Sequence, residues 1–300
     1  MNIIEINNIS NEQNALEFVA ESENSFNEKL FSLVQDISSD SECRAVTLAG
    51  PSCSGKTTAA FRICSYFEKM GKRARLVSID DFYRPDSEMK ALGITDFEGI
   101  SAIDLHLFKS VCADLAAYKK TLFPTFDFPT RSRLALTSYD PSLNDIYIFE
   151  GIQAIYPEIL DCLSPFTYKS IFINVFDGVS YSDVEFSPFE MRFVRRVVRD
   201  YYHRASPVLH TLRLWENVRK NEDINIFPYV SGSDYHINSL LPYETFIIGK
   251  VFLALTDDLP EDCAYFDTVK NIRKRLSVFS DNPFSLSMVP KESLLREFVV

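Results

Sequence analysis

Apolar and polar positions fall into short blocks that predict strands and helices in turn. Four runs have the length and apolar composition of buried strands: Ala45–Ala49, Arg75–Ile79, Asp145–Phe149 and Ser170–Phe176. Apolar residues at helical spacing predict helices between and after them: Lys56–Met70, Leu105–Tyr118, Pro188–Arg204 and Pro207–Lys220. This alternation predicts a doubly wound α/β fold with a mainly parallel sheet.

The two ends of the chain show other patterns. Residues 1–42 are rich in polar side chains and predict a lead-in with one amphipathic helix, Phe26–Ile37. We expect the core to span residues 43–245 and a helical extension, residues 246–300, to pack on it. Within that extension, helical patterns lie near Thr245–Leu255 and Glu261–Leu276. The aromatic, proline-broken stretch at 124–133 predicts an extended loop.

The segment Gly50–Thr57 carries the strongest chemical signal in the chain. It reads Gly-Pro-Ser-Cys-Ser-Gly-Lys-Thr and fits the phosphate-loop pattern G-x-x-x-x-G-K-[ST] in full, with a strand before it and a helix after it. Backbone N–H groups of such a loop surround phosphate oxygens, and the helix adds its positive end. We therefore expect ATP to bind at Gly50, Ser52, Cys53, Ser54, Gly55, Lys56, Thr57 and Thr58, with the Thr57 hydroxyl on Mg²⁺.

Two carboxylates at predicted strand ends can converge on this loop. Asp80 follows the second predicted strand, where it can accept the proton of an attacking hydroxyl or hold Mg²⁺ through water. Glu150 follows the third and is a further candidate Mg²⁺ ligand. The alternative without a functional role is that Asp80 lies in a solvated turn. For Glu150 it is that the residue simply ends a strand in contact with water. The chain has neither the Asn-Lys-x-Asp motif of GTPases nor the Leu-Ser-Gly-Gly motif of transport ATPases.

Four arginines share one face of the helix predicted at 188–204. They lie at i, i+3, i+4 and i+7, which places them side by side: Arg192, Arg195, Arg196 and Arg199. Phosphoryl transfer needs such donors, because negative charge spreads over the phosphoryl oxygens in the transition state. We expect a lid at about residues 187–221, with Arg195 and Arg196 on the nucleotide. The alternative is a helix face neutralised by acidic neighbours.

Charge and cysteine content narrow the functional class. The 31 basic and 42 acidic residues give a net charge of −11, which disfavours nucleic-acid binding and docking on an anionic membrane. Six cysteines are scattered without Cys-x-x-Cys spacing, as is typical of proteins in a reducing compartment. No secretory leader pattern opens the chain, and we expect a cytoplasmic location.

These motifs together resemble the uridine kinase and phosphoribulokinase family of P-loop kinases. The matching blocks occur in the family's order: Ala49–Thr58, Ser78–Tyr83, Asp96–Glu98, Pro124–Phe128, Phe149–Ile152, Arg195–Tyr201 and Phe227–Tyr229. The chain looks most like the bacterial branch in which the kinase follows a TGS region, and that likeness extends to Ser293–Phe298. No TGS region lies in these 300 residues, so the resemblance implies the kinase unit alone.

The resemblance also implies roles for single residues. Asp80 would activate the 5′-hydroxyl of a ribose, Glu98 would hold the ribose hydroxyls, and Tyr83 would line the acceptor pocket. Arg196 and Arg199 would act with Lys56 on the transferring phosphate, with Arg204 assisting. The acceptor pocket would be completed by Phe126, Phe128 and Arg131. A dimer or tetramer is expected on the same basis.

The aromatic loop departs from the family pattern. Phe126 and Arg131 stand where uridine kinases read the pyrimidine with Tyr and His, and they lack the same donors and acceptors. The sequence therefore predicts an ATP- and Mg²⁺-dependent kinase for a small-molecule hydroxyl, with uridine or cytidine as the leading acceptor. A sugar, sugar phosphate or other polyol is the first alternative. A non-catalytic ATP-binding regulator is the second.

Overall fold

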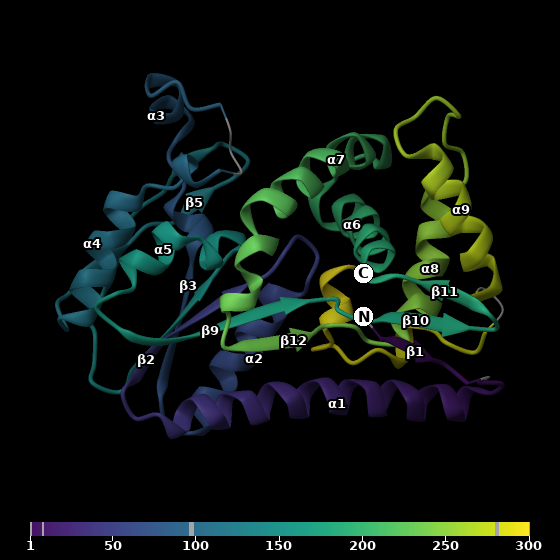
Figure 1. The fold of residues 1–300 in the computed structure, drawn as a ribbon, viewed down its shortest axis with the longest axis horizontal. Coiled ribbons are helices and arrows are strands. Elements are labelled where there is room, and N and C mark those ends of the chain that lie inside the picture. Colours follow the sequence, from purple (N-terminus) through teal and green to yellow (C-terminus); the bar gives the residue numbers. More distant parts are fainter. Residues whose placement is uncertain (1, 8, 96–98, 280–281, 300) are drawn as a thin grey trace.

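A parallel sheet forms the centre of the molecule. The computed structural model describes residues 2–7, 9–95, 99–279 and 282–299. Its main sheet has five parallel strands in the order β12-β9-β2-β8-β3 (Figure 1). They are β2 (Cys43–Ala49), β3 (Arg73–Ser78), β8 (Asp145–Glu150), β9 (Thr167–Asn174) and β12 (Tyr235–Asn238). The predicted doubly wound α/β fold is confirmed.

Side chains of each central strand point alternately into two cores. In β2, Val46 and Leu48 join one apolar cluster, which also holds Ile63 and Phe67 of α2 (Lys56–Lys69). Ala45 and Ala49 join the other, with side chains of α4 (Leu105–Ala116) and α5 (Pro157–Cys162). Successive strand residues face opposite sides of a sheet, so a strand covered by helices on both faces is apolar throughout.

Most of the remaining helices were predicted, but α3 (Asp86–Ala91) was not. They are α1 (Glu12–Ser39), α3 (Asp86–Ala91), α6 (Pro188–Arg204), α7 (Val208–Asn225), α8 (Glu244–Leu255) and α9 (Phe266–Leu276). A capping box starts α6: the Ser187 side chain and the Glu190 side chain each accept a hydrogen bond from the other residue's backbone N–H. The helix stops at Ala205, whose φ of 49° lies in the left-handed region.

The N-terminal lead-in is more structured than its polar composition indicates. The expected helix at Phe26–Ile37 is the second half of α1, which begins at Glu12 and runs along one edge of the molecule (Figure 1). Its buried face includes Ala15, Val19 and Phe26, whereas Phe31 in the predicted part of the helix is exposed. Only three apolar side chains are buried over the first 15 positions, so a window on this sequence shows little amphipathicity.

A small second sheet was not predicted at all. In it β1 (Ile3–Glu5) pairs in parallel with β10 (Gly178–Tyr181), which forms a hairpin with β11 (Val184–Phe186). Both residues of the hairpin turn, Ser182 and Asp183, have positive φ, as a type I′ turn requires. The turn lacks the Asn-Gly or Asp-Gly pair that usually marks such a hairpin in a sequence.

The expected extended loop at 124–133 contains a short hairpin of β5 (Phe126–Asp127) and β6 (Ser132–Arg133). A second antiparallel pair beside it joins β4 (Thr121–Phe123) to β7 (Thr137–Tyr139). Across the part of the chain that the structure describes, no helix has the length and apolar character needed to cross a membrane.

Candidate active site

The phosphate loop depends on glycine at two positions. A Cβ on Gly50 would lie 2.2 Å from the carbonyl oxygen of Ile173 in β9, too close for any side chain. Gly55 caps α2 with φ of 84°, in the left-handed region that glycine adopts without steric cost. Cys53 also has positive φ, 61°, so the loop turns twice before α2 begins. This geometry leaves the first N–H groups of α2 unpaired within the helix and pointing out of its N-terminus.

A cavity of about 480 Å³ opens over the loop. Lys56 lies on its wall, and the Lys56 ammonium donates a hydrogen bond to the carbonyl oxygen of Pro51 at 3.1 Å. The full lining is Ser52, Cys53, Lys56, Thr57, Asp80, Glu150, Ile152, Arg199, His203, Arg204, Arg296 and Glu297. The structure thus brings together the loop, both predicted carboxylates and two of the predicted arginines.

The two carboxylates occupy a poorly solvated place. Burial raises the pKa of Glu150 to about 7, against the opposing attraction of Lys56. Burial likewise raises the pKa of Asp80, which Lys56 again opposes and neighbouring Asp81 reinforces. Asp81 points elsewhere and accepts a hydrogen bond from the backbone N–H of Phe126 at 3.0 Å. Asp80 is therefore available to the cavity, while Asp81 anchors the aromatic loop.

The arginine face of α6 covers the loop. Arg196 donates to the Ser52 hydroxyl at 2.8 Å, and Arg192 donates through Nε to the Ser52 carbonyl oxygen at 3.1 Å. Arg199 pairs with Asp200 at 2.8 Å and also lines the cavity. The helix face thus has the acidic partners of one interpretation, and it also presents Arg199 to the cavity over the loop.

Arg195 requires a correction. We expected it on the nucleotide, but its side chain has no exposed surface and forms an ion pair with equally buried Glu244 at 2.7 Å. Its remaining donors bind Ser239 and the carbonyl oxygen of Cys53. Because the N–H donors of its guanidinium are used within the protein, Arg195 holds the loop in position and does not bind a ligand.

A second cavity, of about 330 Å³, adjoins the first. One wall consists of three aromatic rings whose centroids lie 5.1–5.8 Å apart, those of Tyr83, Phe126 and Phe128. Asp80, Ile152 and Arg204 line both cavities, so they stand where the two meet. Arg131 is at the rim, with an exposed side chain 4.0 Å from Asp86. The predicted acceptor residues thus gather here, except Glu98, which lies outside the described residues.

Several residues of the site carried no sequence signal that we used. Gln153 lines the second cavity, is buried, and donates through Nε2 to the Tyr83 hydroxyl at 2.9 Å, while its Oε1 has no partner. It lies directly after the Phe149–Ile152 block. Asn221 of α7 lines the same cavity. Arg296 and Glu297 line the first cavity from the far end of the chain, inside the segment that resembles the bacterial branch.

The residues around the first cavity suit Mg²⁺. Oxygen donors are present in Thr57, Glu150 and Asp80, and Mg²⁺ prefers oxygen ligands. Among residues with described positions, no cluster of three or more His, Cys, Asp or Glu side chains could hold a metal by itself. In proteins that transfer phosphoryl groups, Mg²⁺ is usually held by one or two carboxylates together with substrate phosphates.

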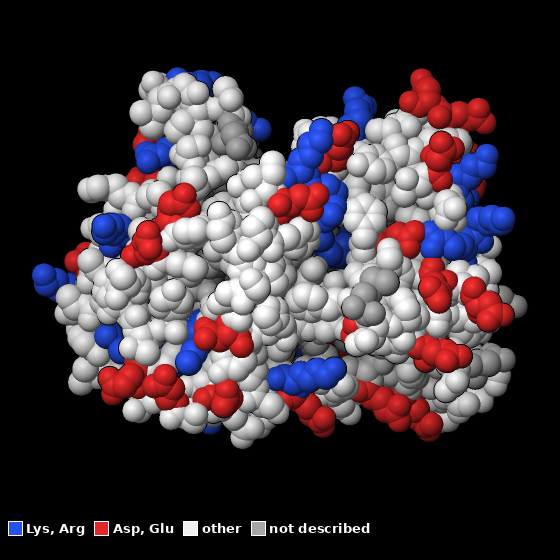
Figure 2. All heavy atoms as spheres, viewed as in Figure 1, with Lys and Arg blue, Asp and Glu red and all other residues white. Residues whose placement is uncertain are grey.

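Charge is distributed in keeping with such a site. On the face drawn in Figure 2, acidic atoms follow much of the lower edge, where α1 lies, and a group of basic atoms is recessed near the middle. The chain is acidic overall, with a net charge of −11, and other basic atoms are scattered over the same face, so the recessed group is one basic region among several (Figure 2).

The strand order and the phosphate loop at the carboxyl end of β2 define the class of protein: a P-loop nucleotide-binding protein with a doubly wound α/β fold. The family is shown by sequence. The model of the Phosphoribulokinase / Uridine kinase family matches residues 45–245, more than half of the chain, and the chain belongs to that family.

Curated relatives are similar at modest identity. Uridine-cytidine kinase C of Dictyostelium discoideum is 27% identical over 165 residues, which make up 55% of this chain and 31% of that protein. The uridine kinase of Ureaplasma urealyticum is 25% identical over 174 residues, 57% of this chain and 76% of the relative. The chain therefore matches only a minor part of the first relative and most of the second.

Among solved structures, one from Silicibacter sp. TM1040, described as a candidate fructose transport system kinase, aligns with a TM-score of 0.50. It covers 69% of this chain and 98% of its own, at 15% identity. A likeness at that identity shows the shared fold alone.

Proposed function

We propose that the protein is an ATP-dependent kinase that transfers the γ-phosphoryl group to a hydroxyl of a small molecule. The observation that carries the proposal is the meeting of two cavities at Asp80 and Arg204. One cavity is built for phosphates, and the other has an aromatic wall that suits an organic acceptor. A carboxylate at their junction is where in-line transfer between the two ligands needs a base.

The donor half consists of the loop residues and the cations around them. Loop N–H groups and Lys56 would bind the phosphates, and Arg199 and Arg204 would stabilise the charge that develops during transfer. Arg196 would act by holding Ser52 in place. Mg²⁺, held by Thr57, Glu150 and Asp80 together with the nucleotide, would neutralise charge on the phosphates. Asp80, which would hold Mg²⁺ only through water, would take the proton of the attacking hydroxyl.

The leading acceptor is a ribonucleoside, uridine or cytidine, whose 5′-hydroxyl would attack the γ-phosphorus of ATP with ADP as the leaving group. The names of the curated relatives support this acceptor, and the three-ring wall offers a stacking surface for a base. The unpartnered Oε1 of Gln153 can accept a hydrogen bond from an O–H or N–H donor of the acceptor.

A sugar, sugar phosphate or other polyol is the second candidate. The Phe126 side chain cannot donate or accept a hydrogen bond, and Arg131 is a cation at the rim of the acceptor cavity. An acceptor with an anionic group would use Arg131 and Arg204, whereas a neutral nucleoside would use the rings. The two candidate acceptors would therefore be bound by different residues of the same cavity.

An acceptor panel tests the proposal. ADP release would be measured with ATP, Mg²⁺ and each of uridine, cytidine, common sugars and sugar phosphates, with Lys56→Met as the control without a phosphate-binding ammonium. We expect acceptor-dependent release with one class and none with the control. Tight ATP binding with no acceptor-dependent release across the panel would instead favour a nucleotide-binding regulator.

A further inference from the structure

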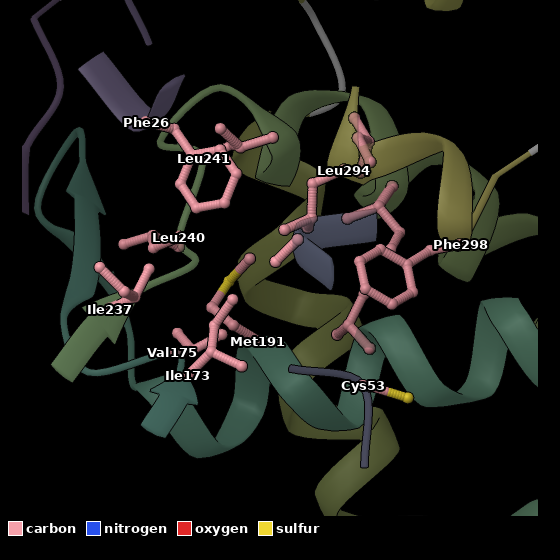
Figure 3. Close-up of a cluster of buried hydrophobic side chains, with 14 of the residues drawn as sticks. Phe26, Cys53, Ile173, Val175, Met191, Ile237, Leu240, Leu241, Leu294 and Phe298 are labelled. Carbon is pink, nitrogen blue, oxygen red and sulfur yellow. The ribbon is translucent and has the colours of Figure 1, made fainter. Parts of the chain in front are cut away.

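The C-terminal segment 293–299 packs against the phosphate loop. After α9 the chain returns to the centre of the molecule, where Figure 1 shows its end beside α6. Four side chains of the segment are almost completely buried: Leu294, Leu295, Phe298 and Val299. Figure 3 shows Leu294 and Phe298 in one apolar cluster with side chains of the sheet, of α6 and of the loop residue Cys53.

The segment contacts the loop directly at Gly55 and indirectly through Arg195. A Cβ on Gly55 would lie 2.3 Å from the Leu294 side chain, so the tail rests directly on the start of α2. The Phe298 ring lies 4.8 Å from the guanidinium carbon of Arg195, which in turn holds the carbonyl oxygen of Cys53 at 3.2 Å. Arg296 donates to the carbonyl oxygens of Leu286 and Val289 at 2.9 and 2.8 Å. The backbone of the tail is therefore fixed from both sides.

The anchored tail places the Glu297 carboxylate at the N-terminus of α2. Its Oε2 accepts hydrogen bonds from the Thr58 hydroxyl at 3.1 Å and from the Thr58 backbone N–H at 3.4 Å. Thr58 lies in the first turn of α2, whose N–H groups have no partner within the helix and attract anions. Glu297 also lines the phosphate cavity and is near enough to Glu150 to raise its pKa.

We propose that Glu297 is an internal competitor for the phosphates of the nucleotide and sets the affinity of the loop for ATP. The inference rests on the proposed function, since it concerns the same cavity. A phosphate oxygen and the Glu297 carboxylate would compete for the same donors, the Thr58 hydroxyl and backbone N–H. The two negative charges would also repel each other strongly in a poorly solvated cavity. The Glu297 side chain is only partly buried, so it can swing away while the tail stays anchored. Nucleotide binding thus includes the displacement of one carboxylate.

Removal of this charge tests the inference without any acceptor. Glu297→Gln keeps the shape of the side chain and an oxygen for the Thr58 hydroxyl but removes the charge. Glu292→Gln is the matched control, because Glu292 is an exposed glutamate of the same tail. Equilibrium binding of Mg·ATP and of inorganic pyrophosphate would be measured by titration calorimetry, and folding would be checked by circular dichroism.

We expect Glu297→Gln to bind both probes about tenfold more tightly than the wild type, which corresponds to about 1.4 kcal/mol, with Glu292→Gln unchanged. Equal or weaker binding by Glu297→Gln, alongside measurable binding by the wild type, overturns the inference and leaves the kinase proposal standing. A gain for ATP but not for pyrophosphate overturns it too, because Glu297 would then act on the nucleoside. If the wild type, Glu297→Gln and Glu292→Gln are all folded and none of them binds Mg·ATP or pyrophosphate, both proposals are overturned.

Discussion

We predict that the buried pair of Arg195 and Glu244 stabilises the fold and also holds the phosphate loop in position. Arg195 donates through Nε and Nη2 to the two carboxylate oxygens of Glu244 at 3.0 and 2.7 Å, and neither side chain has exposed surface. Burial raises the pKa of Glu244, and Arg195 opposes that rise. The pair joins α6 to α8 and fixes the guanidinium that holds Cys53.

Glu244→Ala would leave the Arg195 cation buried without its counter-charge. Loss of one partner from such a pair costs about 3–5 kcal/mol, because the remaining charge stays desolvated. For a chain of 300 residues the unfolding entropy near the midpoint is about 0.6 kcal/mol/K, so the melting temperature should fall by about 5–8 °C.

Urea unfolding followed by tryptophan fluorescence measures this loss. Trp215 is the single tryptophan of the chain and is fully buried, so its emission should change on unfolding. Glu216→Ala is the matched control: it removes a glutamate from the exposed ion pair with Lys220, and we expect no measurable change.

A Glu244→Ala variant as stable as Glu216→Ala would refute the reasoning. The double variant Arg195→Met/Glu244→Leu separates charge from packing, because apolar replacement of a whole buried pair is often neutral. We expect the double variant to recover most of the stability that Glu244→Ala loses. Its nucleotide affinity should stay below that of the wild type, since the donor to the Cys53 carbonyl oxygen is gone.

Three further substitutions test the site and its support. Asp80→Asn should lose phosphoryl transfer by at least a hundredfold and still bind ATP, by analogy with general-base catalysis; near-normal turnover would remove Asp80 from that role. Burial raises the pKa of Glu150 to about 7 from an ordinary value near 4.5, so between these pH values the folded state keeps a proton that the unfolded chain has lost. The unfolding free energy of the metal-free protein should therefore fall as pH rises through this window, by up to about 3 kcal/mol. Glu150→Gln should remove that part of the pH dependence, and an identical pH profile for both proteins in urea titrations would contradict it. Ala205→Gly should raise the unfolding free energy by up to about 1 kcal/mol, because Ala205 has φ of 49°; a less stable variant would show that its backbone is not strained.

Local patterns sufficed for four of the five strands of the main sheet and for the phosphate loop, but the edge strand β12 (Tyr235–Asn238) was not predicted. The strands are short apolar runs, and the loop motif spans eight consecutive residues whose chemistry is local. The spacing of the four arginines placed them on one face correctly. The β1-β10-β11 sheet was missed because its pairing joins residues 3–5 to residues 178–181, and no local pattern records such a partner.

The amino-acid sequence by itself determined the fold class, the phosphate loop, the strand-end carboxylates and the arginine helix. Each of these features depends on residues that are close together along the chain. Only the tertiary structure decided which arginines face a ligand. Arg195 and Arg199 have the same residue type on the same helix face, yet Glu244 buries one while the cavity receives the other. It also decided that Glu297 meets Thr58 across 239 positions of sequence. Such contacts depend on how the chain returns through space, and spacing along the chain carries no information about that return.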